Sequence, residues 1–427
     1  MRVRWIMEGF VEPKIVCGSL LSIGNELLLG DILDTNAHHI ARELRVHGFR
    51  LRRVVTVEDE EDEIARYLLD LLDRSDFVII TGGLGPTDDD RTRQAVAGAL
   101  GRPLTGNREH LERLHRRVER KGIPWSEHTG RLACFPEGAV HMAPELPMAG
   151  FFLEHRGVPC YFLPGVPHEM ETLLARKVIP DLDRRFPGRP IYVKRVLRVQ
   201  ELVESEINRR LASLEPPSPG IEIGYLPQIG ENWVTILVRG TDLDDVTSRL
   251  TEIEERVVAL LGPQYVSGSE DEPMELTVGR LLSGRRWKLA AAESCTGGLL
   301  ARRVTAVPGA SDYFERGFVT YSNEAKVELL GVFRSLLDEH GAVSAATAEA
   351  MARGARESAG VDVAVSITGI AGPTGGSAEK PVGTVFMACS TVRETVVRKH
   401  LFWGGRTQIQ ERAAHAALVL LWRVLLG

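Results

Sequence analysis

Short apolar segments alternate with amphipathic segments along most of this chain, and this alternation constrains the fold more than any other feature. In the first part, strand-like composition is found in Ile15–Ile23, Leu51–Val57 and Phe77–Ile80. Helical spacing is found in Thr35–His47 and Asp62–Leu72. Fully apolar strands between helices are typical of parallel sheets that are covered on both faces. The alternation predicts an α/β layer, and it returns in the last third of the chain.

The length of 427 residues exceeds what a single hydrophobic core usually organises, so two or three domains are expected. Between the two α/β regions lies a shorter α+β pattern, and Gly262–Glu272 has the composition of a linker. We therefore predict two α/β sheet domains joined by a small α+β domain. The predicted domains are residues 1–185, 186–265 and 266–427.

Composition excludes several classes of protein. The formal net charge is −6, so no overall basic field favours direct nucleic-acid binding. The five cysteines include no CxxC pair, which argues against a disulfide framework and a thiolate zinc site. The apolar stretch at the N-terminus is short and contains Glu8, and the late run Ala413–Leu426 is interrupted by charge. Neither a signal peptide nor contact with a membrane is expected, and the expected location is cytoplasmic.

Ser294 lies in the segment ESCTGG, where a predicted strand is followed by a helix. Unpaired amides at a helix start bind anions and can stabilise the oxyanion formed when a serine attacks a carbonyl. Lys326 is the candidate base, because burial lowers the pKa of a lysine and Ser–Lys pairs are variants of the catalytic triad. Tyr321 is placed to orient the lysine or to relay a proton. The neighbouring residues expected to contact substrate are Thr296, Gly297 and Gly298.

The residue pattern alone leaves other interpretations of this segment open. Ser294 can be an ordinary N-cap, which stabilises a helix by about 1 kcal/mol without any chemistry. Lys326 can be a solvated helix lysine. Cys295 can replace Ser294 as the nucleophile, because a position at a helix start lowers the pKa of a thiol.

A second glycine-rich loop, Thr368–Gly376, follows the buried strand Val363–Ile367, where α/β proteins place ligands. It can cradle a phosphate, although a flexible turn has the same composition. Arg406 precedes the last predicted helix and is a candidate phosphate clamp, although a single arginine is a weak signal. The loop glycines expected to contact substrate are Gly369, Gly372 and Gly375.

Two further segments at predicted strand ends, GNELLLGD and TGGLGPTDDD, belong to the first domain. A glycine-rich backbone presents amides to phosphate, and successive aspartates suit a divalent cation that bridges to it. This predicts pyrophosphate chemistry with a metal held by Asp88 and Asp89. Asp88–Asp90 can instead cap a helix. The other residues expected to contact this substrate are Gly24, Glu26, Gly30, Asn36, Gly82, Gly83, Gly85 and Thr87.

Residues 274–427 resemble the C-terminal domain of the CinA family, which is shared with stand-alone nicotinamide-nucleotide amidases. The resemblance is carried by AAESCTGGLLARRVTAVPGASDYF, FVTYSNEAK, GAVS, TGIAGPTGGSAEKPVGTV and the late GGR. It implies hydrolysis of nicotinamide mononucleotide to nicotinic acid mononucleotide and ammonia, with no metal or other cofactor. It also implies Ser294 as nucleophile and Lys326 as base, with Tyr321 close by.

The region from Ile15 to about Asp181 resembles the N-terminal domain of the same family, which is similar to molybdopterin-binding folds. The matching segments are SIGNELLLGDILDTNA, TGGLGPTDDDRT and FLPGVPHEM. This resemblance implies a pyrophosphatase that acts on ADP-ribose with a divalent metal (Mg, Mn or Co). A pterin-binding role is the alternative that the fold alone suggests.

The middle region is similar to the KH-like domain of this family, but it lacks the GxxG clamp of RNA-binding KH domains. Residues 190–265 contain 8 Lys and Arg against 12 Asp and Glu. We interpret the region as a spacer or a dimer contact, and we expect a homodimer. A binding protein with a role in competence or DNA damage is the remaining alternative to an enzyme.

Overall fold

A computed structural model of the chain describes residues 15–120, 122, 124–143, 150–214 and 220–427. Features expected at residues 1–14 and 216–219 lie outside the described residues. The chain divides into two compact units. The first contains the chain up to Val193 together with Val238–Arg249, and the second contains Lys194–Leu237 together with Leu250–Gly427.

The first unit contains a six-stranded sheet in the order β2-β1-β3-β8-β7-β6. The first four of these strands are parallel, and the last two are antiparallel to their neighbours. Apolar side chains on both faces bury the central strands, as the sequence predicted. The strands are β1 (Cys17–Ile23), β2 (Arg50–Val57), β3 (Phe77–Thr81), β6 (Val140–His141), β7 (Phe151–His155) and β8 (Val158–Leu163).

Helices cover both faces of this sheet. Successive side chains of a strand point to opposite sides, and both sets are apolar here, so each face needs a helical layer to bury it. Ile79 packs with α2 (Thr35–Val46) and α7 (Pro167–Leu173), whereas Ile80 packs with α3 (Glu61–Leu72) and α4 (Thr92–Leu100). The remaining elements of the unit are α1 (Asn25–Leu28), β4 (Leu104–Gly106), α5 (Arg108–Arg120), α6 (Glu127–Arg131), β5 (Cys134–Pro136), a π-helical turn (Leu174–Val178) and α8 (Ile179–Arg185).

The middle part of the chain forms a four-stranded sheet in the order β10-β11-β9-β12. The predicted linker Gly262–Glu272 is partly wrong, because it contains β12 (Val266–Ser269), which pairs antiparallel with β9. This strand is short, contains a glycine and shifts register after Val266, so its sequence has the composition of a loop. The other elements are β9 (Ile191–Gln200), α9 (Glu204–Leu211), β10 (Ile221–Pro227), β11 (Glu231–Gly240), α10 (Leu243–Leu261) and a 3-10 turn (Pro263–Tyr265).

The last part contains a five-stranded sheet in the order β14-β13-β15-β16-β17. β13 is parallel to both of its neighbours, and β16 and β17 continue the sheet in antiparallel pairing. The carboxyl ends of β13, β14 and β15 therefore lie at the same edge. The strands are β13 (Leu289–Glu293), β14 (Phe314–Val319), β15 (Val363–Gly369), β16 (Thr384–Thr391) and β17 (Thr395–Leu401).

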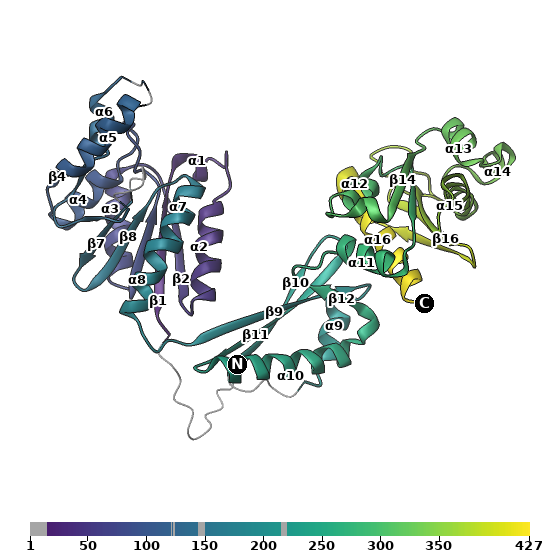
Figure 1. The fold of residues 1–427 in the computed structure, drawn as a ribbon, viewed down its shortest axis with the longest axis horizontal. Coiled ribbons are helices and arrows are strands. Elements are labelled where there is room, and N and C mark those ends of the chain that lie inside the picture. Colours follow the sequence, from purple (N-terminus) through teal and green to yellow (C-terminus); the bar gives the residue numbers. More distant parts are fainter. Residues whose placement is uncertain (1–14, 121, 123, 144–149, 215–219) are drawn as a thin grey trace. The chain divides into compact units, whose positions relative to one another are not determined.

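Two helical layers enclose this sheet (Figure 1). Ala290 and Ala292 of β13 pack on the side of α13, α14 and α15, whereas Leu289 and Ala291 pack on the side of α11, α12 and α16. The alanines let the helices approach the sheet closely. The helices are α11 (Met274–Arg285), α12 (Leu299–Thr305), a 3-10 turn (Ala310–Asp312), α13 (Asn323–Leu330), α14 (Arg334–His340), α15 (Ala345–Ala359) and α16 (Arg406–Leu426).

The predicted α/β class is confirmed, but several helix boundaries differ. The helix that Asp88–Asp90 were expected to cap begins only at Thr92, because Asp90 binds the preceding loop. Arg406 is the first residue of α16 and does not precede it. Cys295 lies in a turn, four residues before α12 begins. Within the described ranges, no helix is long and apolar enough to cross a bilayer.

Candidate active site

Ser294 and Lys326 lie together at the carboxyl ends of β13 and β14. Lys326 Nζ is 3.2 Å from Ser294 Oγ. Ser294 directly follows β13, and Lys326 lies in the first turn of α13, which follows β14. The serine is 8% exposed and the lysine 1% exposed. A hydroxyl and an amine, 32 residues apart in sequence, thus meet at the edge of the sheet where α/β proteins bind ligands.

The surroundings of Lys326 act in opposite directions on its charge, because burial favours the neutral amine and the oxygen atoms around Nζ favour the ammonium ion. Its Nζ contacts the carbonyl oxygens of Thr320 at 2.8 Å, Ser322 at 3.3 Å and Tyr321 at 3.4 Å. It has no ion pair within the described part of the chain. Burial lowers the pKa of this lysine, against smaller opposing contributions from Cys295 and Glu324. A lysine that loses its proton more readily can take a proton from the serine hydroxyl.

The turn from Ser294 to Gly298 fixes the position of the serine. The Ser294 amide donates to Ile367 of β15 at 2.9 Å, and the Gly297 amide donates to the Ser294 carbonyl at 3.1 Å. Gly297 and Gly298 have φ angles of 62° and 99°, which lie in the left-handed region that side chains disfavour. The two glycines are therefore required by the turn that leads from β13 into α12.

Glu293 holds this turn from inside the protein. Its carboxylate, only 1% exposed, accepts hydrogen bonds from the amides of Gly298 at 3.1 Å, Leu300 at 3.0 Å and Ala301 at 2.8 Å. The first amides of α12 are thus occupied by a side chain and are not open to a phosphate. The amides of Cys295 and Thr296 donate to no other residue in the described ranges, so they remain available to an oxyanion.

Glu293→Gln is expected to lower the free energy of unfolding by about 1–3 kcal/mol, because a neutral amide leaves part of this buried set of donors unsatisfied. The kcat of any reaction that uses Ser294 as nucleophile should fall as well, because the turn that holds Ser294 loses the hydrogen bonds of Glu293. Chemical denaturation measures the first effect. Glu357→Gln, at an exposed carboxylate of α15, is the matched control and should change neither quantity. An unchanged unfolding midpoint for Glu293→Gln would exclude the anchoring role.

Cys295 is poorly suited to replace Ser294 as the nucleophile. Its thiol is buried, and burial raises its pKa to about 12. A thiolate is therefore scarce near neutral pH, in contrast to the lowered pKa expected for a thiol at a helix start. The Cys295 carbonyl accepts a hydrogen bond from Gln410 of α16 at 2.8 Å, which ties the turn to the last helix.

Tyr321 contacts Lys326 through its backbone and not through its phenol. The phenolic oxygen accepts a hydrogen bond from Arg406 Nη2 at 3.1 Å, and the side chain is 63% exposed. Arg406 Nη1 donates to the Gly372 carbonyl at 2.7 Å. Arg406 therefore joins the glycine-rich loop to Tyr321 beside the Ser–Lys pair. Gly369 ends β15, and Gly372 and Gly375 have positive φ angles of 77° and 89°.

A buried polar network connects α12 to α16 and β9 through Arg303, His415 and Gln200. His415 of α16 contacts Gln200 Oε1 through Nε2 at 2.9 Å and Arg303 Nη2 through Nδ1 at 3.3 Å. Because an arginine only donates, Nδ1 must accept and Nε2 must carry the hydrogen. Burial and the charge of Arg303 lower the pKa of His415 to about 4, so the ring is neutral near pH 7. Arg303 also pairs with Glu275 at 2.5 Å.

The sequence did not identify Glu293, Gln410 or this network. The role of Glu293 could have been predicted, because an acidic residue at a strand end, followed by a glycine-containing turn, can cap the next helix. Gln410 and His415 cannot be found in this way, because their partners lie more than 100 residues away in the sequence. Thr296, the remaining predicted contact, is buried, and its hydroxyl has no hydrogen-bond partner among the described residues.

In the first unit, the structure gathers Asn36, Thr81 and Gly82 at the carboxyl ends of the parallel strands. Asn36 Nδ2 donates to the Gly165 carbonyl at 2.8 Å, while its buried Oδ1 has no partner in the described part of the chain. Gly82 has a φ of 103°, and a Cβ there would meet the Ile23 carbonyl. The other predicted residues Gly24, Glu26, Gly30, Gly83, Gly85 and Thr87 lie on α1 or in the loops beside these strand ends.

The three successive aspartates have different partners. Asp88 is exposed and bonded to Arg131 at 2.5 Å, which lowers its pKa, and Thr87 lowers the pKa of Asp89. Asp90 accepts from the Gly85 amide at 2.7 Å. No group of three or more His, Cys, Asp and Glu that could hold a metal is present within the described ranges. Asp88 and Asp89 therefore do not fit a metal site built by the protein alone.

Comparison with known protein families covers all three parts of the chain. The model of the "CinA C-terminal domain" matches residues 271–425, and that of the "Damage-inducible protein CinA KH domain" matches residues 194–267. The model of the "Probable molybdopterin binding domain" matches residues 19–184. The predicted order of the domains is therefore confirmed.

Known relatives match over nearly the full length. A CinA-like protein of Syntrophobacter fumaroxidans is 55% identical over 97% of this chain and 97% of its own, and one of Syntrophus aciditrophicus is 42% identical over 95% and 97%. A crystal structure of the competence/damage inducible protein CihA from Agrobacterium tumefaciens is 39% identical, with a TM-score of 0.35, over 36% of this chain and 94% of its own. The chain belongs to the family of CinA-like proteins.

Proposed function

We propose that the C-terminal domain hydrolyses the amide of nicotinamide mononucleotide to nicotinic acid mononucleotide and ammonia. The observation that carries the proposal is the 3.2 Å contact between Lys326 Nζ and Ser294 Oγ, made by a buried lysine without an ion pair among the described residues. Such a pair suits attack on a carbonyl carbon. The substrate is proposed from the resemblance of the motifs around both residues to nicotinamide-nucleotide amidases.

In the first half of the reaction, neutral Lys326 takes the proton of the Ser294 hydroxyl while Oγ attacks the carboxamide carbon. The oxyanion that forms can be met by the free amides of Cys295 and Thr296. When the tetrahedral intermediate collapses, the C–N bond breaks, and the nitrogen takes the proton from Lys326 and leaves as ammonia. The product is an ester between Ser294 and the nicotinoyl group.

In the second half of the reaction, a water molecule takes the place of the released ammonia and hydrolyses the ester. Lys326, neutral again, takes a proton from water as its oxygen attacks the ester carbon. The C–O bond to Ser294 breaks, Oγ recovers a proton from Lys326, and nicotinic acid mononucleotide is released. Arg406, held between Tyr321 and Gly372, is the residue proposed to meet the substrate phosphate.

A second activity, cleavage of the pyrophosphate of ADP-ribose, is proposed for the first unit. Its support is the buried Oδ1 of Asn36, which has no hydrogen-bond partner among the described residues and lies beside the loop that follows β3. Burial raises the pKa of Asp59, with smaller contributions from Glu26, Asp89 and Asp90, so several carboxylates lie near the same loop. A divalent cation there would need ligands from the substrate or water, because the described residues provide no complete protein site.

Chelation separates the two proposed activities. With an excess of EDTA, deamidation of nicotinamide mononucleotide by the full chain is expected to continue at an unchanged rate, because the proposed chemistry uses only protein groups. Cleavage of ADP-ribose should fall to background and return when Mg²⁺ or Mn²⁺ is added. Chromatography of the products measures both reactions. Loss of deamidation with EDTA would contradict the amidase proposal, and chelator-resistant cleavage of ADP-ribose would contradict the metal.

A further inference from the structure

The second unit contains a cavity of about 560 Å³ between β17, α16 and the loop around Gly230. Its lining shares no residue with the Ser294–Lys326 site. The volume is in the range of pockets that bind small molecules. The apolar part of the lining consists of Val396, Phe402, Ala416, Val419, Leu420 and Val424. This surface suits a flat hydrocarbon or aromatic body.

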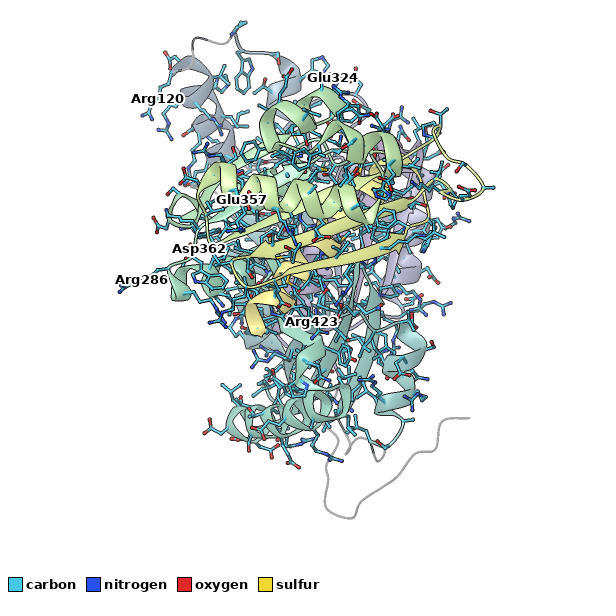
Figure 2. All side chains as sticks on the ribbon, turned by 90° about the vertical axis from the view of Figure 1, so that its right-hand side faces the viewer. Arg120, Arg286, Glu324, Glu357, Asp362 and Arg423 are labelled. Carbon is cyan, nitrogen blue, oxygen red and sulfur yellow. The ribbon has the colours of Figure 1, made fainter. Side chains whose placement is uncertain are left out.

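The charged part of the lining favours an anion. Its side chains include three arginines and two glutamates, and the backbone of Gly427 also contributes to the lining. Arg423, labelled in Figure 2 on the last helix, pairs with Glu201 through Nε at 2.8 Å, so these two charges offset each other. Arg398 and Arg412 have no ion pair within the described ranges. They are the cations left to meet a ligand, with Glu394 as the remaining acid.

The arrangement of the two free arginines supports this interpretation. Among the residues that the structure describes, Arg398 donates only to the Val397 carbonyl, at 3.0 Å, so most of its guanidinium donors have no partner there. The Arg412 guanidinium carbon lies 3.7 Å from the centroid of the Trp403 ring, and one of its Nη groups donates to the Trp403 carbonyl, so both contacts fix its plane beside the cavity. The two histidines of the lining, His400 and His415, have pKa values lowered by burial and add no charge near neutral pH.

We propose that this cavity is a second small-molecule site, which binds an anion with a flat apolar body such as an aromatic carboxylate, sulfonate or phosphate. Arg398 and Arg412 bind the anionic group, and the apolar residues of α16 and β17 bind the ring system. The site is independent of the proposed amidase chemistry, and its ligand can be detected without turnover.

The probe for the test is 1-anilinonaphthalene-8-sulfonate, an aromatic sulfonate, titrated into the full chain and followed by equilibrium dialysis. We expect one site per chain, and binding of the uncharged analogue N-phenyl-1-naphthylamine at least about tenfold weaker. Arg398→Glu should weaken binding of the sulfonate by a similar factor. Lys399→Glu, on the same strand and outside the lining, is the matched control and should leave it unchanged.

Ala416→Trp provides a second measurement, because its side chain would fill the cavity without removing a charge. This variant should not bind the sulfonate, while its circular dichroism and thermal unfolding show whether it is folded. Equal affinity for the charged and uncharged probes would overturn the proposal, and so would undiminished binding of the sulfonate to a folded Ala416→Trp or Arg398→Glu variant. None of these results depends on whether nicotinamide mononucleotide is a substrate.

Discussion

Ser294→Ala is expected to lower the rate of ammonia release from nicotinamide mononucleotide by at least about 10³-fold, because it removes the atom that would form the proposed ester intermediate. Oγ contacts Lys326 and lies in a turn that is otherwise held by backbone hydrogen bonds and Glu293. The fold should therefore survive the substitution. Ammonia release is measured by a coupled assay, and thermal unfolding provides the control for folding.

Cys295→Ala is the matched control for this prediction. The thiol is adjacent in sequence, buried and of raised pKa, so its removal should leave the rate within a few-fold of the wild type. The two variants together distinguish the candidate nucleophiles. Wild-type activity in Ser294→Ala, or loss of activity confined to a folded Cys295→Ala variant, would contradict the role given to the serine.

Lys326→Met and Lys326→Arg are both expected to abolish deamidation. Methionine has no basic group. The guanidinium of arginine has a pKa above about 12 and stays protonated, so it cannot take the serine proton. Retention of positive charge alone should therefore not rescue the reaction. Initial rates at saturating substrate measure the effect, and substantial activity in Lys326→Arg would show that the lysine acts only through its charge.

The pH dependence of the wild type tests the same residue. In the proposed reaction Lys326 acts in its unprotonated form, so kcat/KM should rise with pH and reach a plateau once the lysine is neutral. Because burial lowers the pKa of Lys326 from 10.5, the plateau should begin below the pH expected for a solvated lysine. A pH–rate profile from pH 6 to 10 measures this. An activity that falls with rising pH across this range would exclude an unprotonated lysine as the base.

The sequence predicted most of the fold because its strands are strongly apolar and are bounded by clear turns. The predicted bounds of β1, β2, β3, β15, α2 and α3 each differ from the observed bounds by one or two residues. It failed at β12, where a strand of four residues contains Ser and Gly and is stabilised by pairing with β9. Pairing between distant strands is not visible in the composition of one strand.

The candidate site was predictable to the level of residue types but not of contacts. That Ser294 and Lys326 follow neighbouring parallel strands accounts for their meeting, and a strand-end argument can anticipate it. The roles of the successive aspartates cannot be anticipated, because identical side chains bind Arg131, Thr87 and the loop amides through geometry alone. The same holds for the Tyr321 phenol, which contacts Arg406 and not the lysine.

The most direct test of the Ser294 ester is a trapping experiment with hydroxylamine, which attacks esters in place of water. The full chain is incubated with nicotinamide mononucleotide and increasing hydroxylamine in the presence of EDTA, and the products are separated. We predict that the hydroxamate of nicotinic acid mononucleotide forms at the expense of the acid, and that Ser294→Ala forms neither. Release of the acid and ammonia without any hydroxamate at high hydroxylamine concentration would contradict a covalent Ser294 intermediate.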